Sequence, residues 1–177
     1  MNLITAIEEA FDGVEFSETS LRQFRLTDKF GMSREITDQE WSLAGKQRVD
    51  SKWQDIPDSE IEECDCLLAH MESFEFRYFL PAYMRYSVKN VHRPIWETDI
   101  IGFTVFSLCP STDNTALYHY NVSQYSLLNS AQRRIVVEFL KFVSTVADDV
   151  QRPLAIKALN SYWIQNESNP GWHLATN

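Results

Sequence analysis

The spacing of apolar residues near the start of the chain predicts a short amphipathic helix. Leu3, Ile7 and Phe11 recur at intervals of four, which places them on one helical face. Gly13 follows closely and favours the end of the helix there.

A second helix is indicated by a possible capping box, in which two side chains bond reciprocally to backbone N–H groups. Thr37 and Glu40 have the spacing of such a box. We therefore expect a short helix over residues 38–44, and Gly45 is expected to end it.

Two internal segments show no sustained periodicity. Residues 15–53, outside the helix just described, are expected to form a small irregular or hairpin insertion, with the hairpin around residues 21–32. Residues 111–126 are polar, and we expect irregular structure there. The chain from about residue 166 has the composition of a loosely ordered tail.

A clearer helical pattern begins after Pro57. Ser59 and Glu62 again have capping-box spacing. Four apolar residues then recur on one face of the predicted helix: Ile61, Cys64, Leu68 and Met71.

The following helix is expected to begin at a cap provided by Ser73. One of its faces is aromatic and apolar, and consists of Phe76, Leu80, Tyr83 and Met84. Pro81 lies inside this pattern and cannot donate a hydrogen bond to the carbonyl of Arg77, so we expect a kink or a break there.

The second half of the chain contains three further predicted helices. The first runs from Ile100 to Leu108 and is stopped by Pro110. The second is capped by Asn129 or Ser130, and its expected buried stripe is Ile135, Phe139, Phe142 and Val146. The last follows two aspartates, and its shared face is Leu154, Ala158, Leu159 and Tyr162.

These patterns predict an all-α fold, a compact multi-helix bundle in which residues 1–177 form a single domain. The 177 residues are enough for one core, and 44% of them are hydrophobic, which is typical of a globular domain. Aromatic residues make up 13%, so the core is expected to be rich in rings.

The formal net charge of −9 favours a basic protein partner over nucleic acid, because an acidic protein repels phosphate. No segment resembles a signal peptide or a membrane span, and the odd number of cysteines is typical of reduced thiols. We therefore expect a cytoplasmic protein that does not bind membranes. The sequence leaves its oligomeric state open.

The segment Phe74–Met84 carries a motif that resembles a known family. Its letters F-E-F-R-Y-F-L-P-A-Y-M are similar to the central motif F-R-Y-Y-L-P-A-Y-L of an uncharacterised bacterial family, a domain of unknown function. Other segments resemble the rest of the family's pattern in the same order: residues 6–11, 45–46, 53–56, 128–140 and 158–163. Phe79 departs from the motif, where the family usually has Tyr. The resemblance implies a fold and a bacterial host, and brings no established reaction.

The aromatic motif has two interpretations. Arg77, Tyr78, Tyr83 and Arg85 could line a groove, because a proline-kinked helix opens space beside it. Alternatively, a stripe of Phe and Tyr at helical spacing forms part of the core, and this is the favoured interpretation.

The cysteines and histidines provide no recognisable metal motif. Cys64 and Cys66 lie two residues apart and so diverge on a helix, whereas Cys66 and His70 share a face. Zinc would need two more ligands, for which Cys109 and His92 are candidates. Free thiols and a surface histidine explain the same residues, so we expect no metal and no cofactor.

A ribonuclease site is the enzymatic alternative. The spacing of Arg85 and His92 resembles the short Arg…His spacing of helical HEPN-type ribonucleases. The histidine could act as general acid or base, and the arginine could stabilise charge on the phosphorane.

The leading functional hypothesis is non-catalytic protein binding, as a bacterial immunity-type antitoxin or another accessory protein. Asp58, Glu62 and Asp65 fall at about i, i+4 and i+7, so they would line one face of a helix. Such a face would attract a basic partner, although an acidic start is also what the helix dipole favours.

Overall fold

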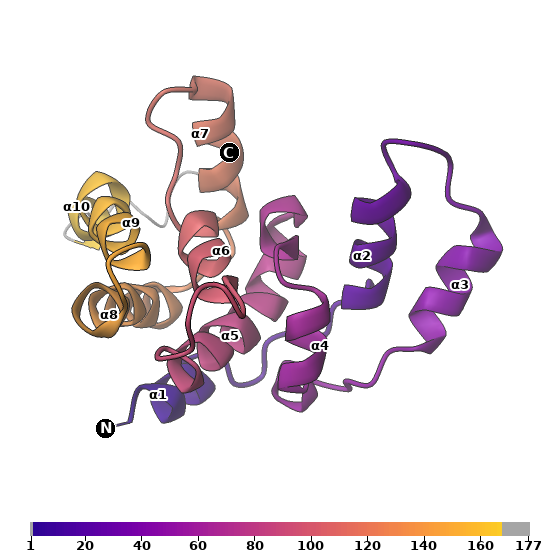
Figure 1. The fold of residues 1–177 in the computed structure, drawn as a ribbon, viewed down its shortest axis with the longest axis horizontal. Helices are drawn as coiled ribbons and strands as arrows, with labels where there is room; N and C mark the ends of the chain where they lie inside the picture. The colour runs from indigo at the N-terminus through magenta and orange to yellow at the C-terminus, as the bar shows by residue number, and fades with distance from the viewer. Residues whose placement is uncertain (1, 168–177) are drawn as a thin grey trace.

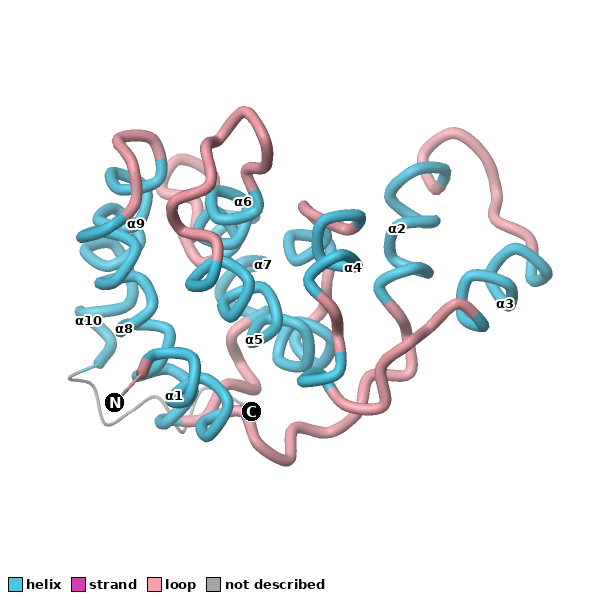
Figure 2. Tube along the Cα trace, turned by 60° about the horizontal axis from the view of Figure 1, so that its bottom comes forward, coloured by secondary structure: helices cyan, strands magenta, loops and turns pink. Residues whose placement is uncertain are grey.

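The computed structural model describes residues 2–167, and every regular element in this range is helical. The α-helices are α1 Leu3–Ala10, α2 Leu21–Phe30, α3 Asp38–Lys46, α4 Asp58–Glu63, α5 Ser73–Lys89, α6 Ile100–Ser107, α7 Thr115–Gln124, α8 Ser130–Val146, α9 Gln151–Ala158 and α10 Ile164–Glu167. Two 3-10 turns, η1 Trp53–Asp55 and η2 Leu67–His70, and a π-helical turn, η3 Leu159–Trp163, complete the set. The prediction of an all-α fold is confirmed, and Figure 2 shows helices joined by loops.

Helix α5 occupies the centre of the body, where it packs against α1, α4, α6, α7 and α8 (Figure 1). Its aromatic face is fully buried, as the sequence pattern predicted. Pro81 lies inside α5 and is itself buried, yet the helix continues through it to Lys89. Of the two expected outcomes, a break is therefore excluded, and a kink at Pro81 stays a prediction.

Helices α6, α8 and α9 build the other side of the body. Helix α9 packs along α8 and also contacts α6, so that α6 is held between α9 and α5. An aromatic cluster fixes η3 to this layer: Tyr125 lies 4.9 Å from Trp163 between ring centroids, and Trp163 Nε1 donates to the Leu108 carbonyl at 2.7 Å. Tyr125 in turn donates to the Ser107 carbonyl at 2.7 Å. These bonds fix the C-terminal end of α6.

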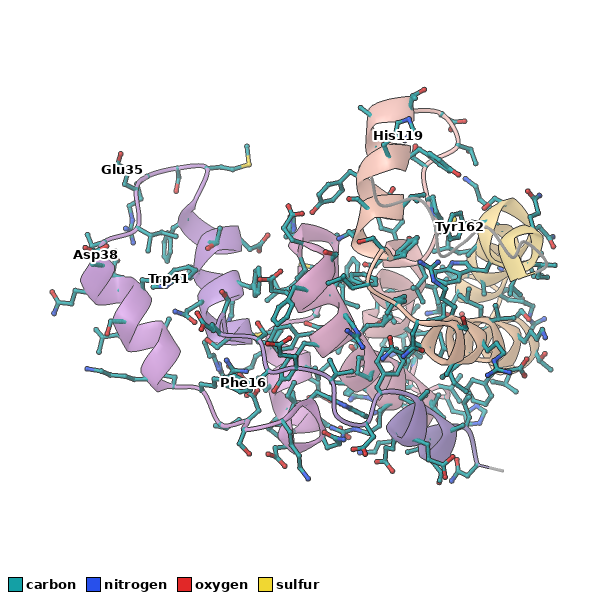
Figure 3. All side chains as sticks on the ribbon, turned by 180° about the vertical axis from the view of Figure 1, so that it is seen from behind. Phe16, Glu35, Asp38, Trp41, His119 and Tyr162 are labelled. Carbon is teal, nitrogen blue, oxygen red and sulfur yellow. The ribbon has the colours of Figure 1, made fainter. Side chains whose placement is uncertain are left out.

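Helices α2 and α3 form an arm that projects from the body, with α3 packed mainly against α2 (Figures 1 and 2). Figure 3 shows Trp41 on this arm, far from Tyr162 in the body. The predicted hairpin in this region is wrong. Ser20 and Gln23 form a capping box that starts α2, and the predicted box of Thr37 and Glu40 starts α3.

Three predicted boundaries are also wrong. Helix α3 runs past Gly45 to Lys46, and Gly45 lies against the Gln23 side chain. The single helix expected after Pro57 is divided into α4 and η2, and α4 has no side-chain cap. The residue before α5 is Glu72, so Ser73 is the first helical residue and not the cap.

The segment expected to be irregular at residues 111–126 contains α7. Asn114 caps this helix, because its side chain accepts a hydrogen bond from the N–H of Leu117. Most side chains of α7 are at least partly exposed, so the helix lacks the apolar period by which sequence patterns are recognised.

The long helix α8 begins at its predicted cap, Asn129, which forms a capping box with Gln132. Its buried face differs from the predicted stripe, since Val146 is exposed and Val136 and Val143 are buried. The predicted tail overlaps the end of α10 at residues 166–167, and the rest of it lies outside the described residues. No helix in the described part of the chain is both long and apolar enough to cross a membrane.

Candidate functional site

An open groove of about 390 Å³ lies where α6, α9 and η2 meet. Helix α6 supplies Phe103 and Phe106, and helix α9 with the residue before it supplies Leu154 and Val150. Cys66 and the turn η2 contribute the third wall. The volume falls within the range of roughly 300–1,000 Å³ that is usual for ligand sites.

Large apolar side chains remain exposed around this groove. Phe106 is 57% exposed, Phe103 38% and Val150 60%. Phe103 and Phe106 are three residues apart, so they lie on one face of α6, while Ile100, Thr104 and Val105 are buried. The opposite face of α6 is thus already used by the core, and nothing within residues 2–167 fully covers Phe103 and Phe106.

Asp99 is the charged group that lines the groove from α6. It precedes the first turn of the helix, and its side chain forms no capping bond. Its Oδ1 accepts a hydrogen bond from Gln151 Nε2 at 3.1 Å, and Gln151 is 3% exposed. Asp99 packs against Gly102, where a β-carbon would lie 2.3 Å from Oδ1. The carboxylate is therefore held in the groove by a buried amide and a glycine.

The thiol and the imidazole on the third wall are poorly suited to catalysis. Burial, with a smaller contribution from Asp65 and Asp28, raises the pKa of Cys66 to about 11, so its thiol stays protonated at neutral pH. His70 is exposed, and its Nε2 lies 3.3 Å from Asp28 Oδ1. The groove thus offers apolar surface and one carboxylate, which suits binding better than nucleophilic chemistry.

The two residues of the ribonuclease hypothesis do not form a joint site. The Arg85 guanidinium is buried and donates to the carbonyls of Gln54, at 2.9 Å, and Ile56, at 2.6 Å. It also lies over the Trp53 ring. His92 is exposed in the loop after α5. Arg85 therefore holds η1 in place, and its charge cannot reach a phosphate without breaking these bonds.

The tyrosines of the groove interpretation belong to the core. Tyr78 and Tyr83 are completely buried, and Tyr78 donates to Asp50 Oδ2 at 2.7 Å. Tyr83 donates to the carbonyl of Cys64. Arg77 donates to Gln132 Oε1 at 3.2 Å, which ties α5 to the start of α8. The core interpretation of this motif agrees with the structure, and a groove lined by these tyrosines does not.

The three acidic residues expected to share a helix face lie in different settings. Asp58 pairs with Lys89 at 3.2 Å, and Glu62 pairs with Arg93. Asp65 lies beyond the end of α4. The prediction of one continuous acidic helix face is therefore wrong, and much of its charge is compensated within the molecule.

The cysteines are free: Cys64 and Cys109 are buried and Cys66 is half-buried. Burial also raises the pKa of Cys64 to about 12. Within residues 2–167, no group of three or more His, Cys, Asp or Glu side chains is placed to hold a metal ion.

Comparison with known proteins gives one match. The sequence profile of a family of unknown function, DUF6714, matches residues 1–167. The chain belongs to DUF6714. No curated protein matches the chain, and no solved structure does.

All the residues that line the groove fall within the DUF6714 match. The aromatic motif that suggested a family from the sequence lies on α5, which is buried. In this DUF6714 chain the motif therefore builds the core, and the groove lies on other elements. A sequence signal for the groove did exist: the segment from Ile100 to Phe106 is apolar on all sides, which is unusual for a surface helix of a small domain.

Proposed function

We propose that this DUF6714 protein is a non-catalytic protein-binding domain, and that the groove between α6 and α9 receives an apolar segment of a basic partner. The observation that carries the proposal is the exposure of Phe103, Phe106 and Val150 around one groove. Exposed apolar patches with polar surroundings are typical of protein interaction sites.

The form of the groove suits a helical or extended partner segment. Phe103 and Phe106 on α6, and Val150 and Leu154 on the opposite wall, present apolar groups at helical spacing. An amphipathic helix can lay its apolar face into such a groove, with anchors at i, i+3 or i+4, and i+7. Covering these side chains would contribute roughly 25 cal/mol for each Å² of apolar surface buried.

The charges around the groove support a basic partner. Asp99 lines it, Asp65 adjoins Cys66, and Asp148 lies two residues before Val150, whereas Asp149 is paired with Arg152 at 3.6 Å. The formal net charge of the whole chain is −9. Such a field speeds the encounter with a cationic protein, and the effect weakens as salt is added.

Of the three acidic residues considered in the sequence, only Asp65 lies beside this groove. Asp58 and Glu62 are engaged by Lys89 and Arg93. The proposed binding surface is therefore the groove and not the face of α4, and the proposed partner is still a basic protein. An immunity-type antitoxin or another accessory protein of a bacterial cytoplasm is the role that fits it, since such a protein benefits from rapid capture of a basic target.

The proposal is tested by capture from a lysate of the source organism with matched valine variants. Val150 and Val49 are both 60% exposed, but Val49 lies in the segment between α3 and η1 and does not line the groove. We expect the wild type and Val49→Lys to capture the same partner and Val150→Lys to lose it, because lysine places a repelling charge at the groove. Equal capture by both variants, or no partner with the wild type, would contradict the proposal.

A further inference from the structure

Asp99 is a carboxylate in a groove whose walls are otherwise mostly apolar. Its hydrogen-bond donor is the neutral amide of Gln151. In the described range of the chain, no lysine, arginine or histidine forms an ion pair with it. On the arm and on α4, by contrast, the carboxylates of Glu40, Asp58 and Glu62 each form an ion pair with a basic side chain.

The position of this carboxylate is fixed by its surroundings. Gln151 is buried at the start of α9, so its amide is held in place and its hydrogen bond fixes Asp99 Oδ1 in the lining of the groove. Gly102 leaves the space that the carboxylate occupies. Two neighbouring elements thus hold one negative group at a defined point of the groove.

Any apolar segment that covers the groove removes water from Asp99. An ionised carboxylate loses several kcal/mol of solvation when it is buried without a partner. A lysine or arginine placed beside it restores that loss through a charge-assisted hydrogen bond. A neutral or acidic residue at the same point leaves the charge unpaired and is selected against.

We infer that Asp99 is the specificity-determining residue of the groove, and that it selects a partner segment with a lysine or arginine beside its apolar anchors. The inference rests on the proposed function and adds the position of the cation. Asp99, the residue before α6, and Phe106 are seven residues apart, or about 10 Å along the helix axis. A partner helix lying alongside α6 would therefore carry the cation at i and apolar residues at i+3 or i+4 and at i+7.

The test uses three fluorescent probe peptides and fluorescence anisotropy. Each probe is a capped amphipathic helix with leucine at i+4 and i+7, and position i carries lysine, norleucine or glutamate. We expect wild-type protein to bind the lysine peptide about tenfold more tightly than the norleucine peptide and to bind the glutamate peptide most weakly. The preference for lysine should decrease with added salt.

Two variants test whether the preference for the lysine peptide depends on Asp99. Asp99→Asn should bind the lysine and norleucine peptides equally, and should bind the norleucine peptide more tightly than the wild type does, because no carboxylate is left unpaired under it. Asp113→Asn removes the same charge from an exposed position before α7 and should behave as wild type. A lysine preference that survives in Asp99→Asn would overturn the inference.

The outcomes separate this inference from the proposed function. If the norleucine peptide binds but lysine gives no advantage, the groove binds apolar segments and the role of Asp99 is refuted. If neither the lysine nor the norleucine peptide binds, or if both bind Val150→Lys as well as they bind the wild type, the groove itself is refuted together with the role of Asp99.

Discussion

The carboxylate of Asp99 lies so close to Gly102 that a β-carbon on the glycine would be 2.3 Å from Oδ1. Gly102→Ala must therefore displace the Asp99 side chain from the position in which the Gln151 amide holds it. Alanine also favours the helix by roughly 0.5–1 kcal/mol over glycine. We predict a free energy of unfolding equal to or slightly above that of the wild type, measured by urea denaturation, and a loss of the lysine preference. A variant that keeps the preference would show that the position of Asp99 is not fixed by Gly102.

Arg85 and His92 are predicted to respond very differently to substitution. Arg85→Ala leaves two carbonyls without their donor, and hydrogen bonds to charged groups contribute roughly 1.5–3 kcal/mol each. We therefore expect this variant to lose about 2 kcal/mol or more of stability. His92→Ala should change stability by less than about 0.5 kcal/mol, because the residue is exposed. Urea denaturation of both variants provides the measurement, and an Arg85→Ala protein of unchanged stability would reopen a catalytic role.

Tyr83 is predicted to be a core residue with one essential hydrogen bond. Its side chain is fully buried and donates to the carbonyl of Cys64, which links α5 to the end of α4. Tyr83→Ala should cost about 3–5 kcal/mol, as is usual for truncation of a buried aromatic residue. Tyr83→Phe should cost about 1–2 kcal/mol, because it keeps the ring and leaves the carbonyl unpaired. Losses below about 1 kcal/mol for the alanine variant, measured in urea, would contradict the burial.

Glu60 is predicted to lower stability as pH rises. It is buried, and this burial raises its pKa; Arg22, 3.4 Å away, opposes the shift, while Asp50 and Glu63 add to it. Because the folded state holds the proton more tightly than the unfolded chain, stability falls as pH rises from the usual glutamate pKa, about 4.3, through the raised value.

The corresponding variant is Glu60→Gln, which keeps the size of the side chain and removes its charge. We expect it to be at least as stable as the wild type at neutral pH. The stability of the variant relative to the wild type should decrease as the pH falls, because the Glu60 carboxyl of the wild type becomes protonated. Urea denaturation of both proteins, from neutral pH down to the usual glutamate pKa, measures this difference. A variant that is less stable than the wild type at neutral pH would show that the ion pair with Arg22 outweighs the desolvation of Glu60.

Local chemistry explains which helices could be predicted. Thr37 and Asn129 lie at caps whose partners are three residues away, so their boxes are visible in the sequence. The buried face of α5 follows from its aromatic period. The start of α2 could have been predicted in the same way, because Ser20 and Gln23 have the same spacing and Leu21 and Phe24 follow three residues apart.

The groove is formed by the face of α6 that stays exposed, and which face stays exposed is set by how the helices pack together. The apolar residues from Ile100 to Phe106 indicated a helix, but sequence alone could not tell which of them would remain uncovered. Similarly, Asp58 and Glu62 are acidic in the sequence, but their basic partners lie about thirty residues away and were found only in the folded structure.

The groove between α6 and α9 can be tested most directly through the thiol of Cys66, which lines it. Cys64 and Cys109 are buried, so a thiol reagent at mildly alkaline pH should modify Cys66 first. We predict that saturating lysine probe peptide slows the alkylation of Cys66, followed by mass spectrometry, and that Phe106→Lys abolishes this protection while Val49→Lys retains it. An alkylation rate that the bound peptide leaves unchanged would contradict binding in this groove.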